Sequence, residues 1–111
     1  MASGRMRRVN EVIREVIGTA LSQGLLKDPR IGFVTVTHVD TSPDLRLARV
    51  YVSVLGGEPE REATLEGLRS AHGPLQARIA DQLRLKRTPK LSFYYDDTVE
   101  RGMRMSELLD Q

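Results

Sequence analysis

The chain has 111 residues, a length that suits one domain with one hydrophobic core, and 40% of its residues are apolar. It contains no cysteine, which excludes disulfides, thiolate nucleophiles and the usual zinc-finger ligand sets. The formal net charge is only +2, but residues 78–90 sum to +4, whereas residues 58–66 and residues 96–111 each sum to −3. Such segregation predicts one basic face and one acidic face.

We expect a single domain over residues 1–111, in which residues 1–5 and about 97–111 are less ordered than the rest. The N-terminus leads into an amphipathic segment rather than an apolar signal core. No apolar run approaches the length of a membrane span. These features predict a cytoplasmic protein with no membrane partner.

The first predicted element is an amphipathic helix over residues 9–21, where apolar side chains recur at helical spacing. Its stripe consists of Val9, Val12, Ile13, Val16, Ile17, Ala20 and Leu21. Gly24 supplies the stop, and Asp28-Pro29 marks the exit of the chain. The cations before the stripe are expected in solvent or on a partner.

A β-hairpin is predicted next, from residues 33–39 and 45–55 with a turn over residues 40–44. The second strand alternates with a period of two, so its two faces can be separated. The aliphatic face should be the core: Ala48, Val50, Val52 and Val54. The other face should point outward: Leu47, Arg49, Tyr51 and Ser53.

Two helices follow, from Glu58 to about Ser70 and from Pro74 onward, separated by a break at Ala71-His72-Gly73. Gly73 can adopt backbone angles that other residues avoid, and Pro74 suits a first helical position. The second helix should bury Leu75, Ile79 and Leu83. Its free amide groups would point into the break and could hold an anion, although a simple kink explains the break equally well.

The last predicted strand covers residues 91–95, with Leu91, Phe93 and Tyr95 on the core face. A capped helix is expected to begin at Asp97. The order α-β-β-α-α-β predicts an α+β domain of two layers, with a three-stranded sheet and the helices on one face.

Five cations in residues 78–90 form the strongest candidate site, because only one acid, Asp81, interrupts them. They are Arg78, Arg84, Lys86, Arg87 and Lys90. Their contacts with phosphates would position an RNA without reading its bases. The alternative is a solvated helix face. A second candidate group is Arg5, Arg7 and Arg8, for which a frayed basic terminus is the alternative.

Other residues are weaker candidates for a functional site. His72 could become charged near a phosphate, and Tyr94 could stack on a base or simply cap the sheet. Asp96, Asp97 and His38 suggest a small hydrolase, but adjacent carboxylates at a strand end look like a turn and a helix cap. No nucleophile motif or metal-ligand spacing occurs, so we expect no enzymatic activity, no metal and no cofactor.

Several segments then occur in the order and at the spacing of one known family. They are residues 5–9 (RMRRV), 28–31 (DPRI), 34–37 (VTVT), 42–45 (SPDL), 48–53 (ARVYVS), 71–73 (AHG), 83–93 (LRLKRTPKLSF), 96 (D) and 102–105 (GMRM). Through them the chain resembles bacterial ribosome-binding factor A along essentially its whole length. Pro74, directly after the break, is not typical of that family.

The resemblance implies a KH-type fold of the second topological class, in which an Ala-x-Gly kink, here Ala71-His72-Gly73, replaces the usual Gly-x-x-Gly loop. It implies a non-enzymatic, cytoplasmic and monomeric protein that binds the free small (30S) ribosomal subunit and its 16S rRNA. Late 16S maturation, 5′-end processing and growth in the cold belong to the same implied role. Arg30, within the 28–31 motif, joins the candidate RNA contacts. The alternative is a protein–protein adaptor that uses the sheet face (Leu47, Arg49, Tyr51) or the acidic helix, without direct RNA contact.

Overall fold

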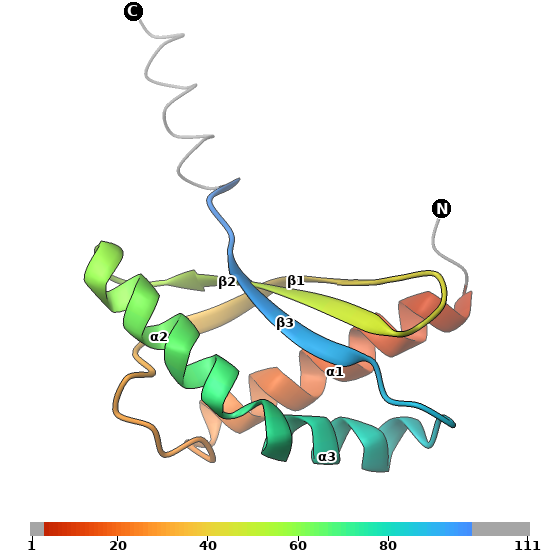
Figure 1. Cartoon of the computed structure of the whole chain (residues 1–111). Helices are drawn as coiled ribbons and strands as arrows, with labels where there is room; N and C mark the ends of the chain where they lie inside the picture. Colours follow the sequence, from red (N-terminus) through yellow and green to blue (C-terminus); the bar gives the residue numbers. More distant parts are fainter. Residues whose placement is uncertain (1–3, 99–111) are drawn as a thin grey trace, which may run out of the picture.

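The computed structural model describes residues 4–98 and confirms the predicted α+β order α-β-β-α-α-β. Two layers are visible in Figure 1, with the sheet above and the helices below it. The elements are α1 (Gly4–Ser22), β1 (Val34–Thr41), β2 (Leu47–Val54), α2 (Glu58–Ser70), α3 (His72–Leu83) and β3 (Lys90–Tyr95). No helix in this described part of the chain is long and apolar enough to cross a membrane.

The sheet has the strand order β1-β2-β3. β1 and β2 form the predicted antiparallel hairpin, whereas β3 pairs with β2 in parallel. A parallel neighbour requires a crossover connection, and α2 and α3 together supply it. This connection brings the end of α3 and the start of β3 back to the turn of the hairpin, where the amide of Lys90 donates to the carbonyl of Arg46 at 2.8 Å.

The core lies between the helices and one face of the sheet, as the alternation in β2 predicts. Ala48, Val50 and Val52 are fully buried, and Val54 is nearly so. The predicted stripe of α3 is confirmed by the burial of Leu75, Ile79 and Leu83, and that of α1 by its five buried residues. In β3, Leu91 and Phe93 are buried but Tyr95 is only partly so.

The predicted boundaries of the hairpin turn were wrong at Asp40 and Thr41, which belong to β1. An irregularity between Val36 and His38 shifts the register of β1 by one residue, so Val36 and Val39 both face the core. The strand therefore runs on to the buried Thr41, whose hydroxyl donates to Asn10 of α1 at 2.5 Å. The actual turn is closed by Ser42, whose hydroxyl accepts from the amide of Leu47 at 3.0 Å.

Two helix boundaries also differ from the prediction. α1 begins at Gly4, so Arg5, Arg7 and Arg8 lie on a helix rather than on a frayed terminus. α3 begins at His72, not at Pro74, and only Ala71 separates the two helices. The helix expected from Asp97 falls almost wholly outside the described residues.

Gly67 lies on the buried side of α2, where Ile31 packs against its backbone. A Cβ at position 67 would lie 2.6 Å from Cγ1 of Ile31, too close for two carbon atoms. We expect Gly67→Ala to lower the free energy of unfolding by about 1–3 kcal/mol, although alanine is the better helix former by ~1 kcal/mol. Thermal unfolding followed by circular dichroism measures the change.

Gly73→Ala is the matched control, because a Cβ at that helical position meets nothing within 4 Å and its φ is not positive. Its melting temperature should be unchanged or higher. Equal melting temperatures for the two variants would contradict the packing assigned to Gly67.

Candidate nucleic-acid interface

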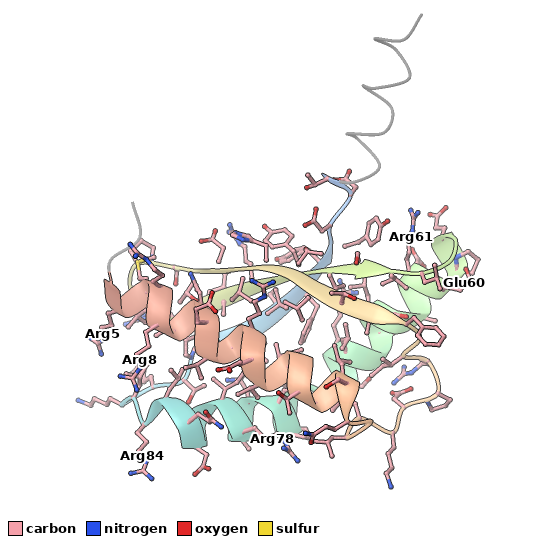
Figure 2. All side chains as sticks on the ribbon, turned by 180° about the vertical axis from the view of Figure 1, so that it is seen from behind. Arg5, Arg8, Glu60, Arg61, Arg78 and Arg84 are labelled. Carbon is pink, nitrogen blue, oxygen red and sulfur yellow. The ribbon has the colours of Figure 1, made fainter. Side chains whose placement is uncertain are left out.

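Cations from three separate segments meet at one end of the molecule. A groove of about 450 Å³ is lined by the first turn of α1, the β1–β2 turn and the loop after α3. Four cations line this groove, and Asp44 is the one acid among its lining residues in the described chain. Figure 2 shows Arg5, Arg8 and Arg84 gathered at the same end. We call this surface the basic end and define it as Arg5, Arg8, Arg46, Arg84, Lys86, Arg87 and Lys90.

All seven side chains of the basic end are at least partly exposed. Arg46 is 3.9 Å from Asp44, but both side chains are well exposed, so this pair contributes little to stability. Arg84 follows the last turn of α3, where unpaired carbonyl groups give the helix a partial negative charge that favours a cation. The arrangement is a concave, solvated and mostly cationic surface, which suits a phosphate backbone.

The backbone of Arg84 supports a role for its side chain. Arg84 is the C-cap of α3 and adopts a left-handed conformation with φ 51° and ψ 37°. That conformation costs an L-residue roughly 1–2 kcal/mol, and glycine adopts it without this cost. An arginine at such a position favours a use for the guanidinium, since a glycine would suit the backbone better.

Arg84→Gly should therefore separate stability from binding. We expect the free energy of unfolding to stay equal or rise by up to about 1 kcal/mol. If the basic end holds RNA, as the sequence predicts, the affinity for RNA should fall, and the plot of log affinity against log salt should become less steep by about 1. Denaturant unfolding and binding titrations at several salt concentrations measure both quantities. Arg84→Lys, which keeps the charge, should retain the slope; an unchanged slope for Arg84→Gly would contradict the assignment.

The structure places Arg78 and Arg7 apart from the basic end. Arg78, labelled in Figure 2, lies in mid-α3, away from Arg84. It lines a hollow together with two acids, Glu15 and Asp81. Arg7 is exposed, but it follows Arg5 by two positions on α1, and residues two apart do not share a helix face. Both remain predicted RNA contacts, but neither lies with the cations of the basic end.

The guanidinium of Arg30 forms hydrogen bonds within the protein. It donates to Asp28 at 2.6 Å and to the hydroxyl of Ser70 at 2.9 Å, which ties the loop before β1 to the end of α2. The side-chain and backbone hydrogen bonds from Arg30 lower the pKa of Asp28 to about 2. These contacts favour a structural role, and an RNA contact of Arg30 stays a prediction.

The kink is tighter than the sequence indicates. The amide of Ala71 donates to Gly67 and Leu68, and Leu75 donates to Ala71, so the two helices are almost continuous. Nδ1 of His72 lies 2.8 Å from the carbonyl oxygen of Arg69, and it must carry the proton because a carbonyl only accepts. The predicted three-residue break before a helix that starts at Pro74 is therefore wrong, and a phosphate-facing role for Ala71-His72-Gly73 stays a prediction.

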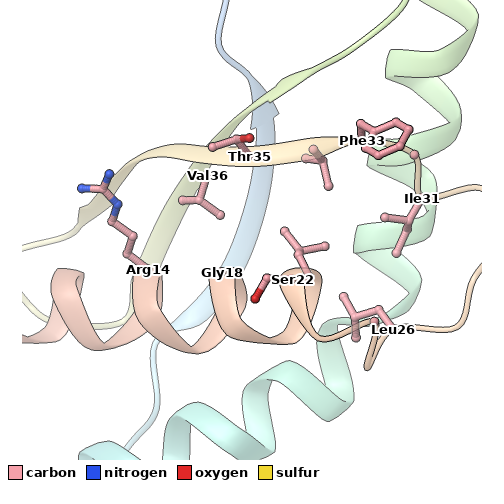
Figure 3. Close-up of a pocket in the computed structure, with 12 residues that line it drawn as sticks. Arg14, Gly18, Ser22, Leu26, Ile31, Phe33, Thr35 and Val36 are labelled. Carbon is pink, nitrogen blue, oxygen red and sulfur yellow. The ribbon is translucent and has the colours of Figure 1, made fainter.

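A second hollow, away from the basic end, is mostly apolar. About 690 Å³ in volume, it lies between the end of α1, the following loop and β1 (Figure 3). Apolar side chains and backbone line most of it, and Arg14 is the one charged lining residue in the described chain. Converging polar groups of the kind that acid–base chemistry requires are missing from this part of the structure.

The structure does bring Asp96, Asp97 and His38 into one hollow, although they are distant in sequence. Hydrogen bonds from the Thr37 and Thr98 hydroxyls are the main causes that lower the pKa of Asp96 to about 2, so it is a poor proton acceptor near neutral pH. Within residues 4–98, no three histidine, cysteine or acidic residues are grouped so as to hold a metal ion.

Sequence reasoning missed Arg46 as a member of the basic end. It stands in the hairpin turn, away from the run at residues 78–90, and only the parallel pairing of β3 with β2 brings the two together. The one available signal was the charge of Arg46 itself beside the turn motif at residues 42–45. That signal points to the basic end only once the strand order is known.

Comparison with known proteins shows what the chain and its fold are similar to. The family model described as "Ribosome-binding factor A" matches residues 5–109. The solution NMR structure of a Thermotoga maritima candidate ribosome-binding factor A is 39% identical, with a TM-score of 0.75, over 90% of this chain and 94% of that one. The crystal structure of ribosome-binding factor A from Thermus thermophilus is 29% identical, with a TM-score of 0.68, over 81% and 94%.

A further match is a homology model of the Thermus thermophilus factor fitted into a cryo-EM map of its complex with the 30S subunit. It is 28% identical, with a TM-score of 0.63, and the match covers 86% of this chain and 96% of that one.

Proposed function

The chain belongs to the ribosome-binding factor A family, and from this premise we propose that it binds the free 30S subunit through its 16S rRNA. We further propose that it supports late maturation of this RNA, including processing of the 5′ end. The related Thermus thermophilus factor, fitted into the map of a 30S complex, supports the choice of partner.

The basic end is the observation that carries this proposal. Its cations come from three segments that the fold brings together around one groove, and such a surface fits phosphates whatever the base sequence. With only five aromatic residues in the chain, base stacking is a weaker basis for RNA binding. The affinity should therefore depend steeply on salt.

In this proposal the protein acts as a cytoplasmic monomer and catalyses nothing. It holds rRNA phosphates with the basic end, and α3, packed into the core through Leu75, Ile79 and Leu83, fixes where Arg84 and the loop that follows it lie. A surface of fixed geometry binds one RNA conformer better than another, and this difference in affinity shifts the equilibrium. Such a shift would matter most in the cold, when RNA rearranges slowly.

A bacterial strain that lacks its own family member tests the maturation role. Expression of this chain should restore mature 16S 5′ ends, measured by primer extension, and a variant with Arg46, Lys86 and Arg87 changed to glutamate should not. If the chain co-sediments with 30S subunits but leaves the 5′ ends unprocessed, the maturation role is wrong and the binding role stands.

The second candidate, an adaptor without RNA contact, is favoured by the outer face of the sheet, which no helix of residues 4–98 covers. A salt titration of 30S binding separates the two. If binding depends on phosphate contacts, the affinity falls steeply as salt rises: the slope of log affinity against log salt concentration is about −0.7 to −0.9 for each contact. The affinity of an apolar protein interface does not fall in this way.

A further inference from the structure

All three helices pack on one side of the sheet, so the other side is uncovered in the described structure (Figure 1). Three rings from three strands form a row across this outer face. The register sets His38 opposite Tyr51 and Tyr51 opposite Tyr94. The centroids of His38 and Tyr51 are 5.8 Å apart, and those of Tyr51 and Tyr94 are 5.6 Å apart, with tilts of 37° and 30°.

Carboxylates lie beside this row. A hollow of about 550 Å³ is lined by the three rings, by Tyr95 and by Asp40, Asp96 and Asp97. No lysine or arginine of residues 4–98 lines it. Arg49 stands opposite Asp40 in the register, yet no ion pair between them is formed in the described structure.

Asp96 is held in a fixed position. Its carboxylate accepts from the hydroxyl of Thr37 at 2.6 Å, from the amide of Thr98 at 2.9 Å and from the hydroxyl of Thr98 at 2.5 Å. Its lowered pKa keeps it ionised across the neutral range. The hollow therefore presents ring faces and fixed negative charge together.

This combination suits a planar cation. The face of a tyrosine ring attracts a guanidinium, and carboxylates bind one through bidentate hydrogen bonds. A contact of this kind already occurs beside the row, where the guanidinium carbon of Arg61 lies 4.4 Å from the centroid of Tyr95. A phosphate backbone would instead meet three carboxylates, which disfavours RNA at this face.

We propose that the outer sheet face docks an arginine-rich segment of a partner protein, with guanidinium groups stacked on Tyr51 and Tyr94 and paired with Asp40, in the negative field of Asp96 and Asp97. The occupant follows from charge complementarity. This surface lies on the side of the sheet opposite the helices and does not depend on the RNA contacts of the basic end. The chain would thereby hold RNA and a cationic protein segment at the same time.

Titration of the ¹⁵N-labelled full chain with a ten-residue peptide of alternating arginine and glycine tests this surface by NMR. Shifts should concentrate on outward-facing residues of β1, β2 and β3. Asp40→Asn combined with Asp97→Asn should weaken binding about tenfold, and so should Tyr94→Ala. Asp96 is left unchanged in these variants because its hydrogen bonds hold the end of β3.

The matched control is Glu62→Gln combined with Glu66→Gln, which removes the same charge from the exposed side of α2. Its affinity should stay within about twofold of the unmodified chain, because long-range charge effects are screened. Equal losses in both double variants, or shifts centred on α2, would overturn the proposal. A ten-residue oligouridylate that shifts the same outward-facing residues, and binds more tightly after Asp40→Asn with Asp97→Asn, would overturn it in favour of RNA.

Discussion

Changing Arg46, Lys86 and Arg87 together to glutamate is expected to abolish co-sedimentation with free 30S subunits. These residues line one groove at the basic end. At 0.1 M salt each lost phosphate contact removes roughly 0.7–0.9 decades of affinity, so three contacts account for a loss of at least about a hundredfold before repulsion is added. Sucrose-gradient sedimentation with purified subunits measures the loss.

The control for this experiment is a variant in which Arg14, Lys27 and Arg49 are changed to glutamate. These three cations also reach solvent, and the net charge changes equally, but they lie outside the basic end. Binding should fall only modestly, through the general field of the protein. Equal losses in both triple variants would show that net charge, rather than the basic end, governs binding.

The largest effect on stability is expected for Phe93→Ala. Phe93 is 2% exposed in the middle of β3 and is the largest of the fully buried side chains in the described structure. Loss of its ring should lower the free energy of unfolding by about 3–5 kcal/mol, a large part of the typical 5–15 kcal/mol for a domain. Denaturant unfolding measures the change.

Tyr94→Ala, at the next position in β3, is the control for this loss of stability. Tyr94 is 40% exposed and points to the outer face, where it contacts Tyr51. Loss of its ring should lower the free energy of unfolding by less than about 1.5 kcal/mol, the usual range for an aromatic pair. If Tyr94→Ala were as costly as Phe93→Ala, the assignment of inner and outer faces in β3 would be wrong.

Strand faces and helix stripes could be predicted because burial follows simple periods. Alternation in β2 identified Val50 and Val52 as core, and the spacing of Leu75 and Ile79 identified the buried side of α3. Local irregularities in the strands were harder to predict. The register shift between Val36 and His38 has no residue signature, and β1 ends two residues later than predicted.

The candidate site was only partly predictable for a related reason. Lys86 and Arg87 are neighbours in sequence, so their run was visible, whereas Arg46 joins them only through pairing between strands that the sequence does not specify. The same holds for the outer face, where His38, Tyr51 and Tyr94 come from three strands. Charge runs predict a basic surface, but strand order decides which residues share it.

Site-directed photo-crosslinking on purified 30S subunits tests the central claim most directly. A benzophenone-bearing residue is placed at Lys86 in the basic end and, in a second protein, at Glu62 on α2. We predict crosslinks from position 86 to 16S rRNA, and few or none from position 62. Crosslinks from position 86 to ribosomal proteins alone, or RNA crosslinks of equal yield from both positions, would contradict the claim that the basic end holds the rRNA.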